Sequence, residues 1–220
     1  MNEPYAVLIG NGHVPESGHV ARLAAGACIV VCADGGANTA RWIGITPDAV
    51  IGDFDSMTDE TRFDFESRGV RFVHQPDQEK TDFEKALHFL LEKGMKRVAV
   101  LGITGRMLDH TLGNFSILKR HADELDLVVF DTEYRIDIVR AEAEFSSVVG
   151  ERISIIPLTE ASGVTFEGLA YPLTGETLSF GIREGTCNRA TAPKFRVSLE
   201  SGLLLVFRPL TDERWIFRPD

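Results

Sequence analysis

The sequence contains few cysteines and no long apolar run. Its three cysteines, Cys28, Cys32 and Cys187, include no Cys-x-x-Cys pair, and their odd number argues against a disulfide framework. This pattern is typical of proteins kept in a reducing compartment. No segment reaches the roughly 18 consecutive apolar residues of a membrane span, and no basic stretch followed by an apolar one opens the chain. We therefore expect a cytoplasmic protein without a membrane partner.

Basic residues are also scarce. Lysine and arginine total 23 against 33 aspartates and glutamates, which gives a formal net charge of −10. Sequence-independent nucleic-acid binding depends on neutralising phosphates with basic side chains. Because no basic run offsets the acidic balance, no nucleic-acid partner is expected. Clusters of acidic side chains can instead bind hard cations such as Mg²⁺.

The first part of the chain alternates predicted strands and helices. Apolar runs indicate buried strands at residues 6–9, 27–33, 97–101 and 127–130, and helices are expected near residues 17–25, 38–43 and 108–119. The clearest helical pattern runs from Phe83 to Leu91, where apolar residues recur at i, i+3, i+4, i+7 and i+8. Just before it, Thr81 and Glu84 have the spacing of a capping box. Alternating strands and helices predict a parallel sheet.

The pattern changes after Asp131. Residues 195–200 alternate with a period of two, and further strand candidates lie at residues 153–156, 177–180 and 203–207. No helical periodicity appears there. We predict an α/β domain at residues 1–132, with a mostly parallel sheet covered by helices, followed by an all-β domain at residues 133–220.

Four polar loops in the α/β domain are expected to follow strands, the second of them directly after the apolar residues Ala49-Val50-Ile51. They read Asp-Gly-Gly-Ala-Asn at residues 34–38, Gly-Asp-Phe-Asp-Ser at 52–56, Asp-Gln-Glu-Lys-Thr-Asp at 77–82 and Gly-Ile-Thr-Gly-Arg-Met-Leu-Asp-His at 102–110. In open α/β sheets, ligands bind outside the carboxyl ends of the strands. Each loop alone has a structural interpretation, but their placement at successive strand ends favours a shared ligand site.

Carboxylates in these loops are candidates for a metal site. Asp53 and Asp55, one residue apart on a turn, can converge on one cation. Mg²⁺ prefers such oxygen ligands and keeps substrate phosphates in its shell. The alternative is a plain polar turn. Asp82 is a third candidate, although the helix dipole alone favours an acidic residue in a first turn, with Thr81 as the cap.

Glycines and basic side chains in the same loops suit phosphate groups. The paired glycines after Asp34 permit close backbone approach to a ligand. Lys80 is a candidate phosphate contact, and Arg106 at a helix start pairs well with phosphate oxygens. Asp109 and His110 can equally be a cap and a surface residue. Metal, backbone cradle and cation are the parts that phosphoryl-type transfer needs.

The four loops resemble, in order and spacing, those of the thiamine pyrophosphokinase family. The all-β half is similar to the family's second domain at residues 168–174 (Gly-Leu-Ala-Tyr-Pro-Leu-Thr), 178–181 (Leu-Ser-Phe-Gly) and 186–188 (Thr-Cys-Asn). The resemblance implies an α/β nucleotide-binding domain followed by a β-sandwich domain, in a homodimer whose active sites lie between subunits. It also implies transfer of a pyrophosphoryl group from MgATP to the hydroxyethyl oxygen of thiamine, giving thiamine diphosphate and AMP.

Residue roles follow from the same motifs. The resemblance implies that Asp53, Asp55 and Asp82 hold Mg²⁺, and Arg106 is expected to add positive charge in the transition state. Around the nucleotide we expect Asp34, Asn38, Gln78, Lys80, Thr81, Thr104, Arg106, Asp109 and His110. Against thiamine, from the partner subunit, the resemblance places Tyr171, Thr186, Cys187 and Asn188.

Two positions depart from the family's pattern. Members often read Thr-Gly-Gly-Arg-Leu-Asp-His where this chain has Thr-Gly-Arg-Met-Leu-Asp-His, so Arg106 stands one position early and Met107 occupies the usual arginine position. Cys187 replaces the usual serine, and a thiol is a weaker hydrogen-bond donor than a hydroxyl.

The expected reaction is in-line attack of the thiamine hydroxyl on the β-phosphorus of MgATP, with catalysis mainly by positioning and electrostatics. Asp55 or Asp82 can accept the hydroxyl proton, and the sequence leaves this choice open. The sequence also leaves two alternative functions open. One is a phosphatase that uses Asp53 as nucleophile. The other is a non-catalytic sensor of thiamine or nucleotide, which the departures at Arg106 and Cys187 favour.

Overall fold

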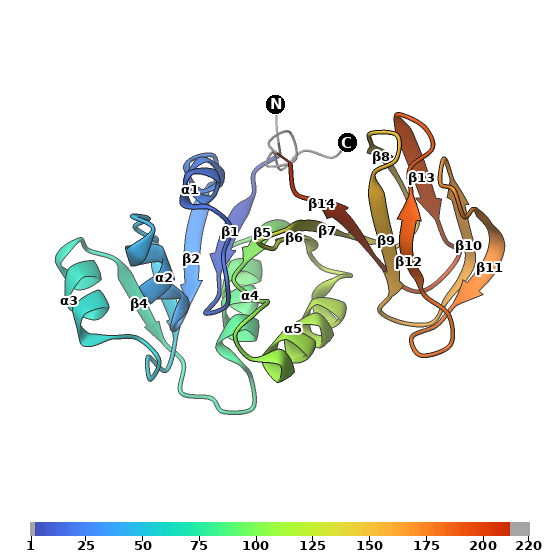
Figure 1. The fold of residues 1–220 in the computed structure, drawn as a ribbon. Helices are drawn as coiled ribbons and strands as arrows, with labels where there is room; N and C mark the ends of the chain where they lie inside the picture. The colour runs from blue at the N-terminus through green and yellow to red at the C-terminus, as the bar shows by residue number, and fades with distance from the viewer. Residues whose placement is uncertain (1–2, 212–220) are drawn as a thin grey trace. The chain divides into compact units, whose positions relative to one another are not determined.

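The computed structural model describes residues 3–211. Within that range the chain forms two compact units, which divide between Glu133 and Tyr134. Residues 212–220 of the predicted second domain, including Trp215, lie outside the described residues. Figure 1 follows the chain by colour through the helices and strands of both units.

The first unit is built on a sheet of parallel strands. They lie in the order β6-β5-β1-β2-β3-β4, and each adjacent pair is parallel. The strands are β1 (Ala6–Ile9), β2 (Ile29–Ala33), β3 (Ala49–Gly52), β4 (Arg71–His74), β5 (Arg97–Leu101) and β6 (Asp126–Phe130). The parallel sheet predicted from the alternation of strands and helices is confirmed.

Helices cover both faces of this sheet. They are α1 (Ser17–Ala25), α2 (Gly36–Trp42), α3 (Asp59–Ser67), α4 (Asp82–Glu92) and α5 (Leu108–His121). Because parallel crossovers are right-handed, the connections from β1 toward β4 place α1, α2 and α3 on one face, and those that run back toward β6 place α4 and α5 on the other. The contacts between α2 and α3 and between α4 and α5 agree with this grouping, which can be followed in Figure 1.

The burial pattern follows from this coverage. β1 is buried along its whole length, as is the run from Val98 to Leu101 in β5, because helices pack on both faces of these strands. α4 packs on β1, β2 and β3. Its cap is Thr81, whose side chain accepts a hydrogen bond from the Glu84 N–H at 3.3 Å. The predicted helix and its cap are confirmed. Among residues 3–211, no helix is long and apolar enough to cross a membrane.

The feature of this sheet that matters for binding lies between β1 and β5. These strands are neighbours, yet the chain leaves β1 through α1 toward one side and leaves β5 through α5 toward the other. The loops that follow their carboxyl ends therefore diverge. Such a switch point is where open α/β sheets bind their ligands.

The second unit is a β-sandwich. Strands β12-β9-β14-β7 pair in one sheet and β11-β10-β13-β8 in another, all antiparallel. They are β7 (Tyr134–Val139), β8 (Glu142–Ser146), β9 (Arg152–Pro157), β10 (Ala161–Glu167), β11 (Leu173–Leu178), β12 (Gly185–Arg189), β13 (Lys194–Ser198) and β14 (Leu204–Pro209). Ile153 and Val206 of one sheet share a buried core with Phe166 and Phe195 of the other. The predicted all-β architecture is confirmed.

Two predicted strands in this unit extend two residues too far. The stretch predicted at residues 195–200 ends at Ser198 in β13, and the second error lies near Phe180. Residues 177–180 (Thr-Leu-Ser-Phe) were predicted as a strand, but β11 covers Leu173–Leu178. Leu178 is buried, whereas Phe180 is 74 % exposed in the turn before β12. Gly181 follows at φ +81°, a conformation that glycine adopts readily and that ends the extended backbone.

Candidate active site

Two loops at the switch point are held together by backbone hydrogen bonds. The loop after β1 donates from Gly10 N to Leu101 O at 2.8 Å and from Gly12 N to Gly102 O at 2.6 Å. This contact requires glycine, because a Cβ at Gly12 would overlap the backbone of the loop after β5. The two loops therefore form one continuous wall of the crevice.

Three carboxylates meet beside this wall. Ligand oxygens of Asp34, Asp53 and Asp82 all lie within 4.8 Å of one another. They come from the ends of β2 and β3 and from the start of α4. Gly52 makes the approach possible, since a Cβ there would lie 3.0 Å from Asp34 Cβ and 3.0 Å from Asp82 Cγ. The structure thus brings together two members of the predicted metal triad and adds Asp34.

Asp34 is the buried member of this carboxylate cluster. Its side chain accepts a hydrogen bond from Ser56 N at 3.0 Å through Oδ2, while Oδ1 is buried and has no hydrogen-bond partner among the described residues. Burial raises the pKa of Asp34 to about 6, the Ser56 hydrogen bond opposes this, and the Asp82 carboxylate adds to the rise. A buried carboxylate oxygen that accepts no hydrogen bond is able to bind a cation.

Asp53 and Asp55 differ although they share a loop. Asp53 accepts a hydrogen bond from Gln78 Nε2 at 3.0 Å, which holds the pKa of this carboxyl below its usual range. Asp55 is exposed, and its Oδ1 accepts from the Ser56 hydroxyl at 3.0 Å. Asp55 lines the same cleft but does not belong to the cluster of ligand oxygens.

Asp82 has a buried cationic partner. Lys85, one turn further along α4, is 3 % exposed and its Nζ lies 2.8 Å from Asp82 Oδ1. This ion pair orients Asp82 and offsets part of the negative charge of the cluster. One ammonium facing three carboxylates leaves a net negative site of oxygen donors, which fits a hard divalent cation such as Mg²⁺.

The Asp34 pKa predicts a pH-dependent effect on stability. A folded-state pKa of about 6 lies above the unfolded value near 3.9, so this group favours folding below about pH 4 and loses that contribution as pH rises through 6. We expect Asp34→Asn, without divalent cation, to stabilise the protein at about pH 7.5 by roughly 1–2 kcal/mol after solvent screening. The gain should shrink steadily as pH falls below 6.

Urea unfolding in EDTA across this pH range measures the effect, with the exposed Asp123→Asn as the matched control. If Asp34→Asn were no more stable than the unsubstituted protein at neutral pH, the raised pKa of Asp34 would be contradicted. Adding Mg²⁺ should stabilise the unsubstituted protein and leave Asp34→Asn nearly unchanged, because only the former retains the full cluster.

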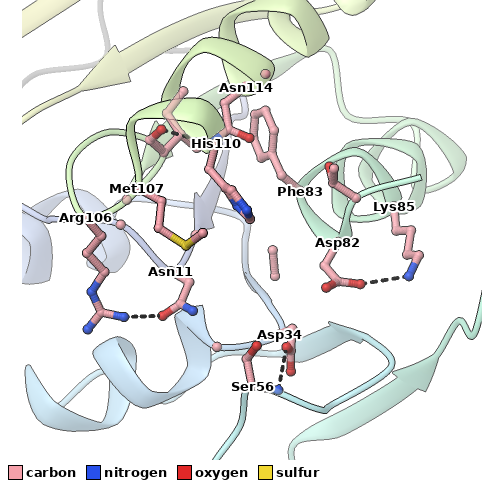
Figure 2. Close-up of a pocket in the computed structure, with 18 of the residues that line it drawn as sticks. Asn11, Asp34, Ser56, Asp82, Phe83, Lys85, Arg106, Met107, His110 and Asn114 are labelled. Atoms are coloured by element: carbon pink, nitrogen blue, oxygen red, sulfur yellow. Dashed lines mark hydrogen bonds and ion pairs between the residues drawn. The ribbon is translucent and has the colours of Figure 1, made fainter. Parts of the chain in front are cut away.

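The cluster opens onto a cleft of about 670 Å³. Figure 2 shows Asp34 and Asp82 on one side and Arg106 beside Asn11 on the other, with His110 and Met107 projecting between them. Arg106 donates to Asn11 Oδ1 at 2.8 Å and has a φ of +53°, which is unusual for a residue other than glycine. Arg106 stands at the position where the family that the sequence resembles often has a second glycine. Its backbone has a positive φ, a conformation that glycine adopts readily.

The predicted nucleotide contacts divide into two groups. Those that line the cleft are Asp34, Gln78, Lys80, Thr81, Arg106, Asp109 and His110. Asn38 and Thr104 are absent from its lining. The Asn38 side chain instead links Ser56 O, at 2.9 Å, to Thr58 N, at 3.0 Å, and the Thr104 hydroxyl donates to Asp131. These two side chains brace the loops around the cleft.

The cleft also contains polar residues that the sequence motifs did not indicate. Asn11, Lys85 and Asn114 all line it, and Asn114 Nδ2 donates to Ile103 O at 2.8 Å. The signal for Asn11 was present, since Gly10-Asn11-Gly12 follows a strand as the other loops do. Lys85 is three residues after Asp82, which makes the two neighbours on a helix, but only the fold shows that Lys85 is buried.

A smaller pocket, of about 200 Å³, lies in the second unit. Three of the four residues predicted to contact thiamine, Tyr171, Thr186 and Asn188, line it. Asn188 is buried and holds the Tyr171 backbone at both ends, accepting from its N–H at 3.0 Å and donating to its carbonyl at 2.8 Å. Cys187 is not among the lining residues. It has a φ of +57°, and its N–H donates to Ser154 Oγ at 3.0 Å.

Comparison with known proteins agrees with these two units. The family model described as thiamin pyrophosphokinase, catalytic domain, matches residues 20–129, and the model described as thiamin pyrophosphokinase, vitamin B1 binding domain, matches residues 133–204. Thiamine pyrophosphokinase of Bacillus subtilis is 30 % identical over 180 residues, covering 80 % of this chain and 84 % of that protein. Thiamin pyrophosphokinase 1 of Caenorhabditis elegans is 27 % identical over 186 residues, covering 79 % and 74 %.

Solved structures of thiamine pyrophosphokinases have the same fold as this chain. The crystal structure of the Bacillus subtilis thiamine pyrophosphokinase matches with a TM-score of 0.81 at 25 % identity, over 96 % of this chain and 100 % of that one. Thiamin pyrophosphokinase from Candida albicans shares the fold, with a TM-score of 0.82 at 18 % identity, over 94 % and 89 %. On the two matched domain models and the Bacillus subtilis relative, this chain belongs to the thiamine pyrophosphokinase family.

Proposed function

We propose that this chain is an enzyme that transfers the pyrophosphoryl group of ATP to the hydroxyethyl oxygen of thiamine, giving thiamine diphosphate and AMP. One observation carries the proposal: the Asp34, Asp53 and Asp82 cluster faces Arg106 across a cleft at the switch point of a chain from this family. A volume of about 670 Å³ lies in the range of small-molecule sites, which is roughly 300–1,000 Å³.

We propose Mg²⁺ as the ion of the carboxylate cluster. The unpartnered Oδ1 of Asp34 and the oxygens of Asp53 and Asp82 would hold it, and Asp55 remains a candidate ligand from the same loop. When bound, the ion neutralises charge that develops on phosphate oxygens. Removing it with EDTA should reduce turnover to the background rate, and added Mg²⁺ should restore it. Turnover that persists in EDTA would exclude this role.

The chain's own residues position the reactants. In the proposed reaction, the thiamine hydroxyl oxygen forms a bond to the β-phosphorus, the bond between that phosphorus and the α–β bridging oxygen breaks, and AMP leaves. The Arg106 guanidinium, fixed by Asn11, faces the carboxylates and is placed to stabilise phosphate charge. Lys80, Gln78, Thr81, Asp109 and His110 line the same cleft and are proposed nucleotide contacts. Asp55 and Asp82 both remain candidates for accepting the hydroxyl proton.

The pocket of the second unit is the proposed thiamine site. Tyr171, Thr186 and Asn188 line it, and the exposed Cys187 follows Thr186 in the chain. From the family resemblance we propose that this site acts with the cleft of a partner subunit in a homodimer. Sedimentation of the purified protein tests the dimer, and a cytoplasmic location is proposed with it.

A single assay distinguishes the proposed reaction from the two alternative functions, the phosphatase and the sensor. The protein is mixed with thiamine and MgATP, and the products are separated. AMP together with thiamine diphosphate is the expected result. Inorganic phosphate without AMP would indicate the phosphatase that uses Asp53, and binding of both ligands without product would indicate a sensor.

A further inference from the structure

A second cluster of metal-binding side chains lies between α4 and α5. Glu84 and His88 are four residues apart and so project from the same side of α4. His121 is the last residue of α5. One ligand atom from each of the three lies within 4.8 Å of the others. None of them lines the cleft, so the proposed nucleotide site does not account for this arrangement.

His121 gives a second, independent observation that favours a metal. Its side chain is buried, with 4 % of the residue exposed, yet neither ring nitrogen has a hydrogen-bond partner among the described residues. Its Nε2 lies 3.6 Å from Glu84 Oε1, beyond hydrogen-bonding distance. The His88 ring meets it edge to face, with centroids 5.0 Å apart. Buried polar atoms are almost always paired, so this imidazole is set up to bind a group that completes the cluster.

The donor atoms define which ion fits. Two imidazole nitrogens and one carboxylate oxygen suit Zn²⁺ and neighbouring first-row metals, whereas Mg²⁺ prefers oxygen ligands alone. Glu84 has one oxygen available, because Oε2 accepts from Arg120 at 2.8 Å and Oε1 faces His121. The Arg120 charge opposes a cation, but its side chain is 53 % exposed and can move into solvent. His88 is half-buried, which gives the ion a path of entry.

We propose that Glu84, His88 and His121 form a transition-metal site that binds Zn²⁺ and fastens α4 to the end of α5. Bonds of about 2.0–2.1 Å would draw the three side chains closer together, and a water can complete a four-coordinate site. Both helices begin at the cleft, α4 with Asp82 and α5 just after Arg106. The metal would therefore stabilise the first unit without taking part in the reaction, and the inference holds whatever reaction the cleft performs.

Titration of the full chain with ZnCl₂ tests the site, using calorimetry and thermal unfolding without nucleotide and with excess Mg²⁺ present to occupy the Asp34, Asp53 and Asp82 cluster. We expect one Zn²⁺ per chain at this site and a rise in Tm of a few degrees. His88→Ala should weaken binding by more than about 10-fold, as should His121→Asn. His19→Ala, a histidine on α1 outside the cluster, is the matched control and should bind as the unsubstituted protein does.

Substitution with Co²⁺ identifies the ligands directly. Visible d–d absorption that is present in the unsubstituted protein and His19→Ala, and absent in His88→Ala, supports the site. A thiolate-to-cobalt band, no bound metal, or binding in excess Mg²⁺ that survives His88→Ala would overturn it. Because His88 is only half-buried, His88→Ala keeps the test decisive even if the buried His121→Asn fails to fold.

Discussion

Asp53→Asn is expected to lower the rate of AMP formation by about 10³-fold or more while the protein stays folded. The substitution keeps the size of the side chain and its acceptor oxygen for Gln78 Nε2, but it removes one of the three charges of the carboxylate cluster. Asp53 lies on the surface of the cleft, and its loss leaves no cavity in the core. Turnover with thiamine and MgATP measures the effect, and circular dichroism checks the fold.

Asp55→Asn makes the sharpest comparison, because it alters the same loop in the same way. Asp55 lies outside the cluster and contacts Ser56. An ion held by the cluster without Asp55, with Asp82 as the proton acceptor, predicts that Asp55→Asn lowers the rate by less than about 10-fold. Asp59→Asn, at the exposed start of α3, is the control for lost surface charge. Equal losses in Asp53→Asn and Asp55→Asn would instead support the triad of Asp53, Asp55 and Asp82 predicted from the sequence.

Gly36→Ala is expected to destabilise the protein by about 3 kcal/mol or more, the largest effect on stability among the substitutions considered. A Cβ at this position would overlap the backbone carbonyl oxygen of Ile9, and both residues are buried. α2 would have to move away from β1 to relieve the overlap. Because the loop before α2 carries Asp34, activity should fall together with stability.

Urea unfolding of Gly36→Ala and Gly18→Ala provides the matched pair. Gly18 lies in α1 and has nothing within 4 Å of the position of an added Cβ. Alanine there should be neutral or slightly stabilising, since it favours the helix by up to about 1 kcal/mol. If both substitutions changed the urea midpoint of unfolding equally, close packing between α2 and β1 would not be the reason that residue 36 is glycine.

Much of the fold was predictable because local patterns and burial agree. Strands covered on both faces appear as apolar runs, as in β1 and β5, and the helix that Thr81 caps follows a helical repeat. The strand predicted near Phe180 was wrong because there the residue type and the burial disagree. An apolar side chain at an exposed turn carries the same letter as one in a core, and only the tertiary structure separates them.

The composition of the site was harder to predict than its place in the sheet. Successive strand ends located the cleft, but whether Asp34 or Asp55 joins the carboxylate cluster depends on backbone angles. Asp34 has a φ of +36° and Gly52 a φ of +149°, and neither value can be read from residue types. The i, i+3 spacing of Asp82 and Lys85 indicates a contact on α4. The burial of Lys85 could not be read from that spacing, because lysine side chains are mostly exposed.

The hydrogen bonds that join the loops after β1 and β5 also bear on how the protein folds. β1 can pair with β2 as soon as both exist, but its second neighbour, β5, comes about ninety residues later in the chain. Contacts between such distant segments form late, because closing a long loop costs entropy before any contact repays it. During synthesis, the wall that carries Arg106 can join the carboxylates only when most of the first unit has emerged. We therefore expect the ability to bind a nucleotide to appear only after most of this unit has folded, and nucleotide binding can be used to measure when the unit is complete.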